Sequence, residues 1–251
     1  MRIQYCSDLH LELEQNSNYF ESTPLEVSGD ILILAGDIVP LHDTYLNNPF
    51  FRFISEKYRQ VFWVPGNHEF YHSDICRYST SYNIPITGNT NIVNNVVLQY
   101  EGIWFVFSTL WSKISAENMK NIEKNVQDFE LITNNNNRFK ASDFNKLHDD
   151  SLGFIKQSLA GINEKVVVVT HHLPSLSCNS KVHNQSLINE AFCVDLTDYI
   201  KDCNANFWIH GHSHFNHNPV IVGNSILLTN QLGYIHLNES DSFKRNAYFS
   251  V

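Results

Sequence analysis

The chain lacks any pair of cysteines spaced for a thiolate metal site or a disulfide framework. Its cysteines are odd in number, scattered over 251 residues, and none forms a Cys-x-x-Cys pair. This pattern predicts reduced, mostly buried thiols rather than a disulfide-stapled fold or a cysteine-ligated zinc site. The five are Cys6, Cys76, Cys178, Cys193 and Cys203.

Long apolar runs are absent as well. The longest, such as residues 31–35 and 166–169, fall well short of the ~20 residues that a membrane-spanning helix needs. Residues 1–8 turn polar too soon to provide the apolar stretch of a signal peptide. We therefore expect a cytoplasmic protein with no membrane partner.

Positive charge is also scarce. Lys and Arg number 17 against 26 Asp and Glu, so the formal net charge is −9, which disfavours a nucleic-acid partner. The 43% of hydrophobic residues suffices for a buried core. At this length we expect one domain over residues 1–251. The pattern makes no prediction of oligomeric state.

Five short apolar runs each lead into a polar motif, as buried strands do when they feed the loops of a site. The runs are 3–6, 31–35, 61–64, 166–170 and 207–209. The motifs after them are Asp8-Leu9-His10, Gly36-Asp37, Gly66-Asn67-His68-Glu69, His171-His172 and His210-Gly211-His212-Ser213-His214. Because the runs are almost wholly apolar, we expect strands that are covered on both faces.

Hairpins and helices are predicted between these strands. Gly102 and Gly223 separate paired apolar runs, at 96–100 with 103–107 and at 220–222 with 225–229. Ser142 is the expected cap of a helix with one apolar face, a second helix is expected over about 190–203, and residues 247–251 are expected to add a strand. Together they predict an α/β fold of mixed sheets flanked by helices.

Each polar motif is weak when taken alone, because Asp-x-His and Gly-Asp are common in ordinary turns. Jointly they bring two carboxylates, one amide and four imidazoles to strand ends, where the loops of an α/β fold converge. That oxygen and nitrogen donor set suits Mn, Fe, Zn, Ni or Co. Seven donors are too many for one tetrahedral ion but suffice for two adjacent ions that share a carboxylate.

In this order, from residue 8 to residue 214, the motifs resemble those of the calcineurin-like metallophosphoesterase superfamily, and the segments 108–111, 128–129 and 230–234 resemble a subgroup of bacterial predicted phosphohydrolases. The resemblance implies a four-layer αββα fold, in which two mixed β-sheets pack as a sandwich flanked by helices. It also implies two divalent or trivalent transition metal ions, manganese among them, and a small-molecule phosphoester substrate, either a phosphodiester or a phosphomonoester.

Site roles follow from the same resemblance. It assigns Asp8, His10 and His214 to the first metal and Asn67, His171 and His212 to the second, with Asp37 bridging both. His172 remains the alternative to His171. His68 is expected beside the substrate as the catalytic residue, and a hydroxide bridging the metals is the expected nucleophile. Glu69 is expected to orient His68 or a nearby ligand, with a simple helix-start carboxylate as the alternative.

The chain departs from the protein phosphatases of that superfamily. It has no Asp-Arg-Gly after residue 36, Pro65 stands where they carry an arginine, and Leu232 stands where the subgroup often has one. A Ser/Thr protein phosphatase is therefore disfavoured, since such arginines grip a phosphomonoester. Two other functions remain open: a catalytically silent interaction module with this fold, and a nuclease, which the net charge disfavours.

Overall fold

The computed structural model describes residues 1–251 and contains two six-stranded sheets. The strands of the first sheet are β1 (Arg2–Cys6), β2 (Ile31–Ala35), β3 (Gln60–Val64), β4 (Tyr82–Pro85), β5 (Thr90–Asn94) and β14 (Tyr248–Ser250). Their spatial order is β14-β1-β2-β3-β5-β4. The four central strands run parallel, and β14 and β4 close the two edges in the antiparallel sense.

The second sheet repeats this plan. Its strands are β6 (Val96–Tyr100), β7 (Ile103–Phe107), β10 (Val166–Val169), β11 (Phe207–Ile209), β12 (Val220–Val222) and β13 (Ser225–Leu228). The order is β12-β13-β11-β10-β7-β6, again with parallel central strands and antiparallel edges. A small separate ribbon pairs β8 (Thr133–Asn134) with β9 (Asn137–Arg138).

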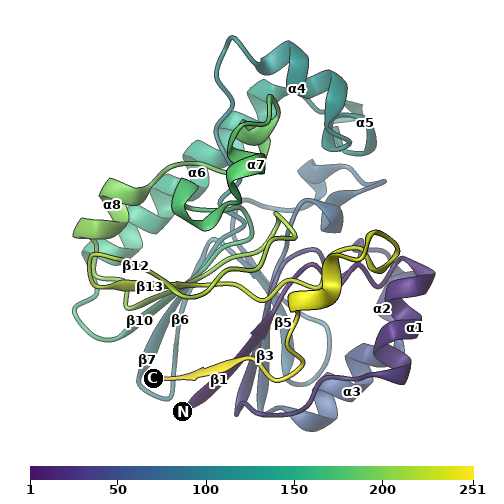
Figure 1. Cartoon of the computed structure of the whole chain (residues 1–251), viewed down its shortest axis with the longest axis vertical. Coiled ribbons are helices and arrows are strands. Elements are labelled where there is room, and N and C mark those ends of the chain that lie inside the picture. The colour runs from purple at the N-terminus through teal and green to yellow at the C-terminus, as the bar shows by residue number, and fades with distance from the viewer.

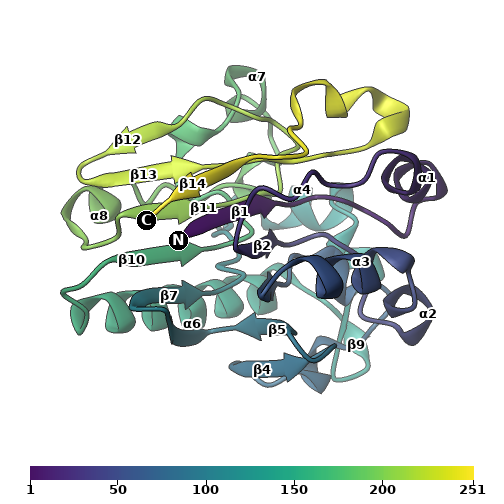
Figure 2. The same cartoon turned by 90° about the horizontal axis from the view of Figure 1, so that it is seen from below.

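Helices cover the outer faces of both sheets (Figure 1). The helices are α1 (Glu14–Ser22), α2 (Asp43–Leu46), α3 (Pro49–Lys57), α4 (Met119–Asn125), α5 (Asp128–Leu131), α6 (Ala141–Ala160), α7 (Lys181–Asn184) and α8 (Thr197–Asp202). The first three lie beside the first sheet, and α6 and α8 lie against the second, as Figure 2 also shows. None of them is long and apolar enough to cross a membrane.

Successive side chains of a strand point to opposite faces of its sheet, and this alternation explains the layers. In β2, Ile31 and Ile33 belong to the core between the sheets, whereas Leu32 and Leu34 face the helix side with α3 residues such as Ile54. The side chains of β10 in the second sheet alternate in the same way between the central core and the core under α6 and α8. Each fully buried aliphatic side chain contributes roughly 1.5–3 kcal/mol. Strands that are apolar on both faces therefore fix the four-layer arrangement, and the predicted fold is confirmed.

Both predicted hairpins are present, with β6 paired to β7 and β12 paired to β13. The two helix predictions need correction. The long helix α6 begins before Ser142, with Lys140 at the cap position. The helix expected over about 190–203 is broken, because residues 193–194 pair with Leu173 instead and only α8 is helical beyond them.

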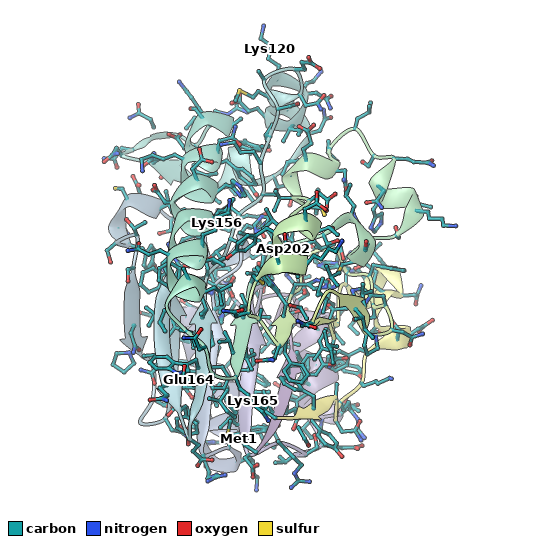
Figure 3. The ribbon with its side chains drawn as sticks, turned by 90° about the vertical axis from the view of Figure 1, so that its left-hand side faces the viewer. Met1, Lys120, Lys156, Glu164, Lys165 and Asp202 are labelled. Carbon is teal, nitrogen blue, oxygen red and sulfur yellow. The ribbon has the colours of Figure 1, made fainter.

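The two ends of the sandwich differ in what they carry. Met1 lies at one end, beside β14 at the chain's other terminus, while Lys120 of α4 lies at the opposite end (Figure 3). Lys156 of α6 and Asp202 of α8 mark the helical layer over the second sheet (Figure 3). The carboxyl ends of the parallel strands point away from the termini, so their loops meet under α4, α5 and α7 (Figure 1).

Candidate metal centre

The polar motifs after the parallel strands converge into one buried site between the two sheets. The loops after β1, β2 and β3 supply Asp8, His10, Asp37 and Asn67, and the loops after β10 and β11 supply His171, His212 and His214. Their donor atoms form two groups in which all atoms lie within 4.8 Å of one another: Asp8, His10 and His214, and Asp37, His171 and His212. Asn67 joins the second group through His171, so all seven residues predicted as ligands are brought together.

The first group brings Asp8 and His10, near the start of the sequence, together with His214, toward its end. His10 Nε2 lies 3.0 Å from His214 Nε2, and His214 Nε2 lies 3.5 Å from Asp8 Oδ1. Asp8 also accepts hydrogen bonds from the backbone N–H of His212, which ties the loop after β1 to the loop after β11. The three donors thus face a common point.

The second group includes the predicted amide. His171 Nε2 lies 3.0 Å from His212 Nδ1, 3.2 Å from Asn67 Oδ1 and 3.3 Å from Asp37 Oδ2. Asp37 Oδ2 also lies 3.9 Å from His10 Nε2 in the first group. This one carboxylate oxygen therefore lies between the two groups, where a bridging ligand would have to be.

The outer nitrogens of the histidines show which atoms carry protons. His10 Nδ1 contacts Glu12 at 3.1 Å, His214 Nδ1 contacts Glu239 at 2.6 Å, and His171 Nδ1 contacts the Ala35 carbonyl at 2.8 Å. With a proton on each of these outer nitrogens, His10 Nε2 and His214 Nε2 present lone pairs to each other at 3.0 Å, and His171 Nε2 presents its lone pair to His212 Nδ1 at the same distance. Facing lone pairs repel unless a cation lies between them, and such outer contacts are typical of metal-bound histidines. The residues therefore fit a pair of metal ions.

The backbone of these loops is strained. Five of the seven residues have positive φ: Asp8, His10, Asp37, His212 and His214, between 46° and 78°. Such conformations are rare for residues other than glycine and concentrate at functional sites. Gly66 and Gly211 are required for a different reason, because a Cβ would lie 2.2 Å from Asp37 Oδ1 at Gly66 and 2.6 Å from Asp8 Oδ2 at Gly211.

Glu69 holds two of these loops in place. Its carboxylate accepts four N–H donors: the backbone N–H groups of Gly66, Asp37 and Ile38, and the Trp63 indole, at 2.6–2.9 Å. Burial and the charge of Asp37 raise the pKa of Glu69, and the backbone donors counteract this shift. Of the two roles expected for Glu69, these contacts fit the orientation of a nearby candidate ligand rather than of His68, since Glu69 shapes the turns that carry Asp37 and Asn67.

We expect Glu69→Gln to lower the free energy of unfolding by about 3–5 kcal/mol, because an amide NH₂ placed among four N–H donors leaves buried donors unpaired. Urea unfolding of the full chain measures the change. Glu56→Gln on the exposed side of α3 is the matched control and should lie within about 0.5 kcal/mol of wild type. Equal midpoints for both variants would contradict the structural role of Glu69.

Asn67 is oriented by Asp128, at the start of α5. Asp128 Oδ1 accepts hydrogen bonds from Asn67 Nδ2 and from the Tyr71 hydroxyl, both at 2.8 Å. With its NH₂ group held there, Asn67 directs its oxygen toward His171. Burial raises the pKa of Asp128 against the effect of these two donors. Nothing in the strand-end pattern pointed to this contact, which joins positions 61 residues apart.

Removing that orientation should weaken metal binding. We expect Asp128→Ala to reduce the affinity for the second metal ion by about 10–100-fold, the range typical of lost contacts behind a ligand. Asp128→Asn keeps an oxygen for Asn67 Nδ2 and should restore much of it. Calorimetric titration of the metal-free variants measures their metal affinity. Circular dichroism shows whether either variant has also lost stability. Equal metal affinity in wild type and Asp128→Ala would refute the role.

His68 lies at the exposed edge of the site, outside both groups. Its Nδ1 contacts Glu12 Oε1 at 3.2 Å, the oxygen that also contacts His10, and its ring packs on Tyr71 with centroids 4.0 Å apart. Burial alone would lower the pKa of His68, but the charges of Asp37 and Glu12 outweigh it and raise the pKa to about 9. The same histidine contacts hold the pKa of Glu12 at about 2, despite its burial.

Access to the site is from the side of His68. The side chains of His68 and His214 are each 13% exposed, whereas Asp8, His10 and His171 are completely buried. Tyr234 packs against His10 and His214 at the same edge, with ring centroids 4.7 and 4.5 Å away. A substrate therefore meets His68, His214 and Tyr234 before the deeper residues.

Other histidines lie outside the two donor groups. His172 is buried against His212 with no hydrogen-bond partner for its ring nitrogens, and His42 and His183 are exposed on short helices or their caps. Asn230 begins the segment 230–234 that resembles the subgroup, and its side chain forms hydrogen bonds with the backbone of Tyr5 and Lys244. Leu232 is buried in the outer core rather than directed into the site.

The chain is similar in sequence or in fold to several known proteins. A family model described as calcineurin-like phosphoesterase matches residues 1–216. The uncharacterized protein L509 of Acanthamoeba polyphaga mimivirus is 32% identical over 279 aligned residues, covering 100% of this chain and 97% of the viral protein. The structure of phosphopantetheinyl hydrolase from Mycobacterium tuberculosis superimposes with a TM-score of 0.69 at 17% identity, covering 99% of this chain and 95% of that chain. TT1561 of Thermus thermophilus gives a TM-score of 0.50 at 14% identity, covering 92% and 88%.

These two structures show the fold that they share with this chain, and the family match defines its class. The chain belongs to the calcineurin-like phosphoesterase family. It is a metal-dependent phosphoesterase, and candidate His and Asp clusters for divalent ions are present at the strand ends. The predictions of the superfamily and of an enzyme are both confirmed.

Proposed function

We propose that the chain hydrolyses small phosphodiesters at a dinuclear centre formed by the seven strand-end residues. The observation that supports it most directly is the position of Asp37 Oδ2, 3.3 Å from His171 Nε2 and 3.9 Å from His10 Nε2. A carboxylate shared by two donor groups suits two cations about 3.5–4 Å apart. Because those groups come from both sheets, the whole chain would act as one domain.

Asp8, His10 and His214 would hold the first ion, and Asn67, His171 and His212 the second, with Asp37 between them. When bound, such ions lower the pKa of a coordinated water and polarise the phosphoryl oxygens. We propose manganese, iron, zinc, nickel or cobalt as occupants, since the donors are nitrogen and oxygen only. His171 is preferred to His172 because only the former faces Asp37.

His68 would protonate the departing oxygen of the substrate. Its Nδ1 is held by Glu12, so Nε2 is the nitrogen directed toward Asp37 Oδ2, 4.0 Å away at the open edge. A pKa raised to about 9 keeps the imidazole protonated near neutral pH, which suits a proton donor. Glu12 acts through His68 and His10 and is therefore a positioning residue.

A phosphodiester is favoured over a monoester by the charges at the site. The hydrogen bonds and ion pairs of the candidate ligands involve carboxylates, amides, hydroxyls, imidazoles and backbone groups, with no lysine or arginine. A monoester dianion usually relies on such cations, whereas a diester carries a single negative charge. The absence of a gripping cation also argues against a phosphoprotein substrate.

Turnover of two chromogenic esters tests the proposal. Metal-free protein would be reconstituted with each candidate ion and assayed on bis(p-nitrophenyl) phosphate and on p-nitrophenyl phosphate. We expect two ions per chain at the dinuclear centre and a higher kcat/KM for the diester. A phosphopantetheinyl ester belongs in the wider panel, because a structure with the same fold is named for its hydrolysis. No turnover with any ion, or fewer than two ions per chain, would refute the proposal.

A further inference from the structure

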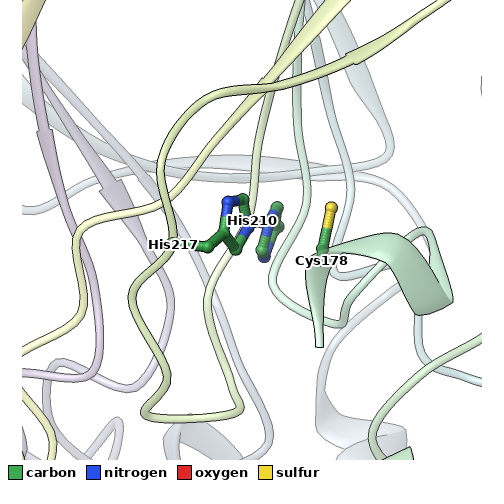
Figure 4. Close-up of side chains that lie close together, drawn as sticks. All are labelled: Cys178, His210 and His217. Atoms are coloured by element: carbon green, nitrogen blue, oxygen red, sulfur yellow. Dashed lines mark hydrogen bonds between the residues drawn. The ribbon is translucent and has the colours of Figure 1, made fainter. Parts of the chain in front are cut away.

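A second group of metal-type donors lies outside the candidate centre. It consists of Cys178, His210 and His217, whose donor atoms all lie within 4.8 Å of one another. Cys178 closes the short turn Leu176–Cys178, His210 follows β11, and His217 lies in the loop before β12. Figure 4 shows the His210 ring between the other two side chains. Cys178 and His210 are completely buried, and His217 is partly buried.

The protons of the two histidines are constrained by their neighbours. His217 Nδ1 lies 2.7 Å from the Asn218 carbonyl and must donate to it, so His217 Nε2 carries a lone pair. That lone pair faces His210 Nε2 at 3.1 Å. The spacing is close to the 3.0 Å between His10 and His214 and between His171 and His212 in the candidate dinuclear centre.

A simple hydrogen bond between the two histidines leaves this group incompletely explained. If His210 Nε2 donates to His217, the His210 Nδ1 lone pair remains buried without any donor, because Nδ1 has no partner in the protein. If His210 Nδ1 carries the proton instead, two Nε2 lone pairs face each other at 3.1 Å, an arrangement that repels unless a cation lies between them. A thiol beside the His210 side chain adds a donor that soft transition metals prefer.

We propose that Cys178, His210 and His217 form a third metal site, separate from the dinuclear centre, for Zn²⁺ or another thiophilic ion. One sulfur and two nitrogens are a donor set found in zinc sites, with distances of about 2.3 Å to sulfur and 2.0–2.1 Å to nitrogen. Binding exchanges the Cys178 thiol proton, released to solvent, for a sulfur–metal bond. The absence of Cys-x-x-Cys pairs does not exclude it, since these donors are distant in sequence.

His217, the most exposed of the three, also lines a surface cavity of about 500 Å³ together with Asn216 and Thr229. A water from that side would complete four-coordination. The site would also fix both ends of one loop, because His210 and His217 flank His212 and His214 in the sequence. Those two residues hold positive φ values of 78° and 51°, which the surrounding structure must maintain. A metal at this site would therefore act as a structural support for two ligands of the dinuclear centre.

Cobalt substitution of the full chain tests the proposal, because the dinuclear centre contains no sulfur. We expect a thiolate-to-cobalt charge-transfer band and three ions per chain in the wild type. Cys178→Ser and, independently, His217→Ala should each lose one ion, and Cys178→Ser should lose the band. Cys193→Ser, a buried thiol in the same apolar cluster, is the matched control and should keep both.

Wild-type protein with no thiolate band, or a band that persists in Cys178→Ser, would overturn the third site. These outcomes are distinguishable from failure of the proposed function. A protein without the dinuclear centre would still show the cobalt–thiolate band, and one without the third site would still bind two ions and hydrolyse phosphodiesters. His217→Ala keeps the test decisive if Cys178→Ser fails to fold, since His217 is near the surface and its loss should still remove one ion.

Discussion

Asp37→Asn should reduce kcat/KM for a phosphodiester by at least about 10³-fold and lower the metal content from two ions in the dinuclear centre to at most one. The asparagine loses the negative charge that two adjacent cations would share, and such electrostatic contributions are commonly the largest in catalysis. It keeps an oxygen for the His68 backbone N–H, which Asp37 Oδ1 accepts at 3.0 Å. The fold should therefore survive the change.

Asp30→Asn is the matched control, because Asp30 and Asp37 flank the two ends of β2. Asp30 lies at the end remote from the site and pairs with Arg59 at the surface. Its replacement should leave activity within about twofold, since exposed ion pairs contribute little. Circular dichroism and elemental analysis of both variants complete the comparison. An Asp37→Asn protein with wild-type turnover and two ions would show that the carboxylate is not shared.

Metal removal should destabilise the protein strongly. One ion present at 1,000 times its Kd stabilises the folded state by about 4.1 kcal/mol, if it does not bind the unfolded chain. For a protein of this size, that corresponds to a Tm lowered by about 8–16 °C per ion. The physical cause is the set of facing lone pairs and strained loops left without cations, including the His10–His214 contact at 3.0 Å.

Differential scanning calorimetry with and without a chelator measures this effect. The chelator should lower the Tm of Asp37→Asn much less than that of wild type, because this variant already lacks the carboxylate that both ions would share. Restoring the ion in excess should return the wild-type Tm. If the chelated and metal-loaded wild-type proteins melt at the same temperature, the ions do not hold the loops together.

The sequence predicted the convergence of the candidate ligands better than the residues that contact them from behind. Asp8, Asp37 and Asn67 follow parallel strands of the first sheet whose apolar runs are evident, so their convergence at one end of that sheet follows from parallel topology, and His171 joins them in the same way from the second sheet. Glu12, Asp128 and Glu239 lie on turns or short helices with no such signal. Their contacts depend on how distant segments pack, which local patterns do not encode. The Asp128–Asn67 hydrogen bond is the clearest case.

Secondary structure failed where tertiary contacts override local preference. Residues 190–203 have apolar spacing that favours one helix, yet Val194 N donates to the Leu173 carbonyl, so the segment extends beside the loop after β10. The strands β4 and β5 were missed because Asn and Pro weaken their β pattern, although β5 completes the parallel core of the first sheet. Both errors concern segments whose conformation is fixed by a neighbour.

The distribution of the candidate ligands over the two sheets constrains how the centre is assembled during synthesis. The first 94 residues supply Asp8, His10, Asp37 and Asn67, but His171, His212 and His214 emerge from the ribosome much later. β1 also remains an unpaired edge until β14, at residues 248–250, is made. Tight metal uptake must therefore follow the docking of both halves, so the ions would be acquired late in folding, after release of nearly the whole chain.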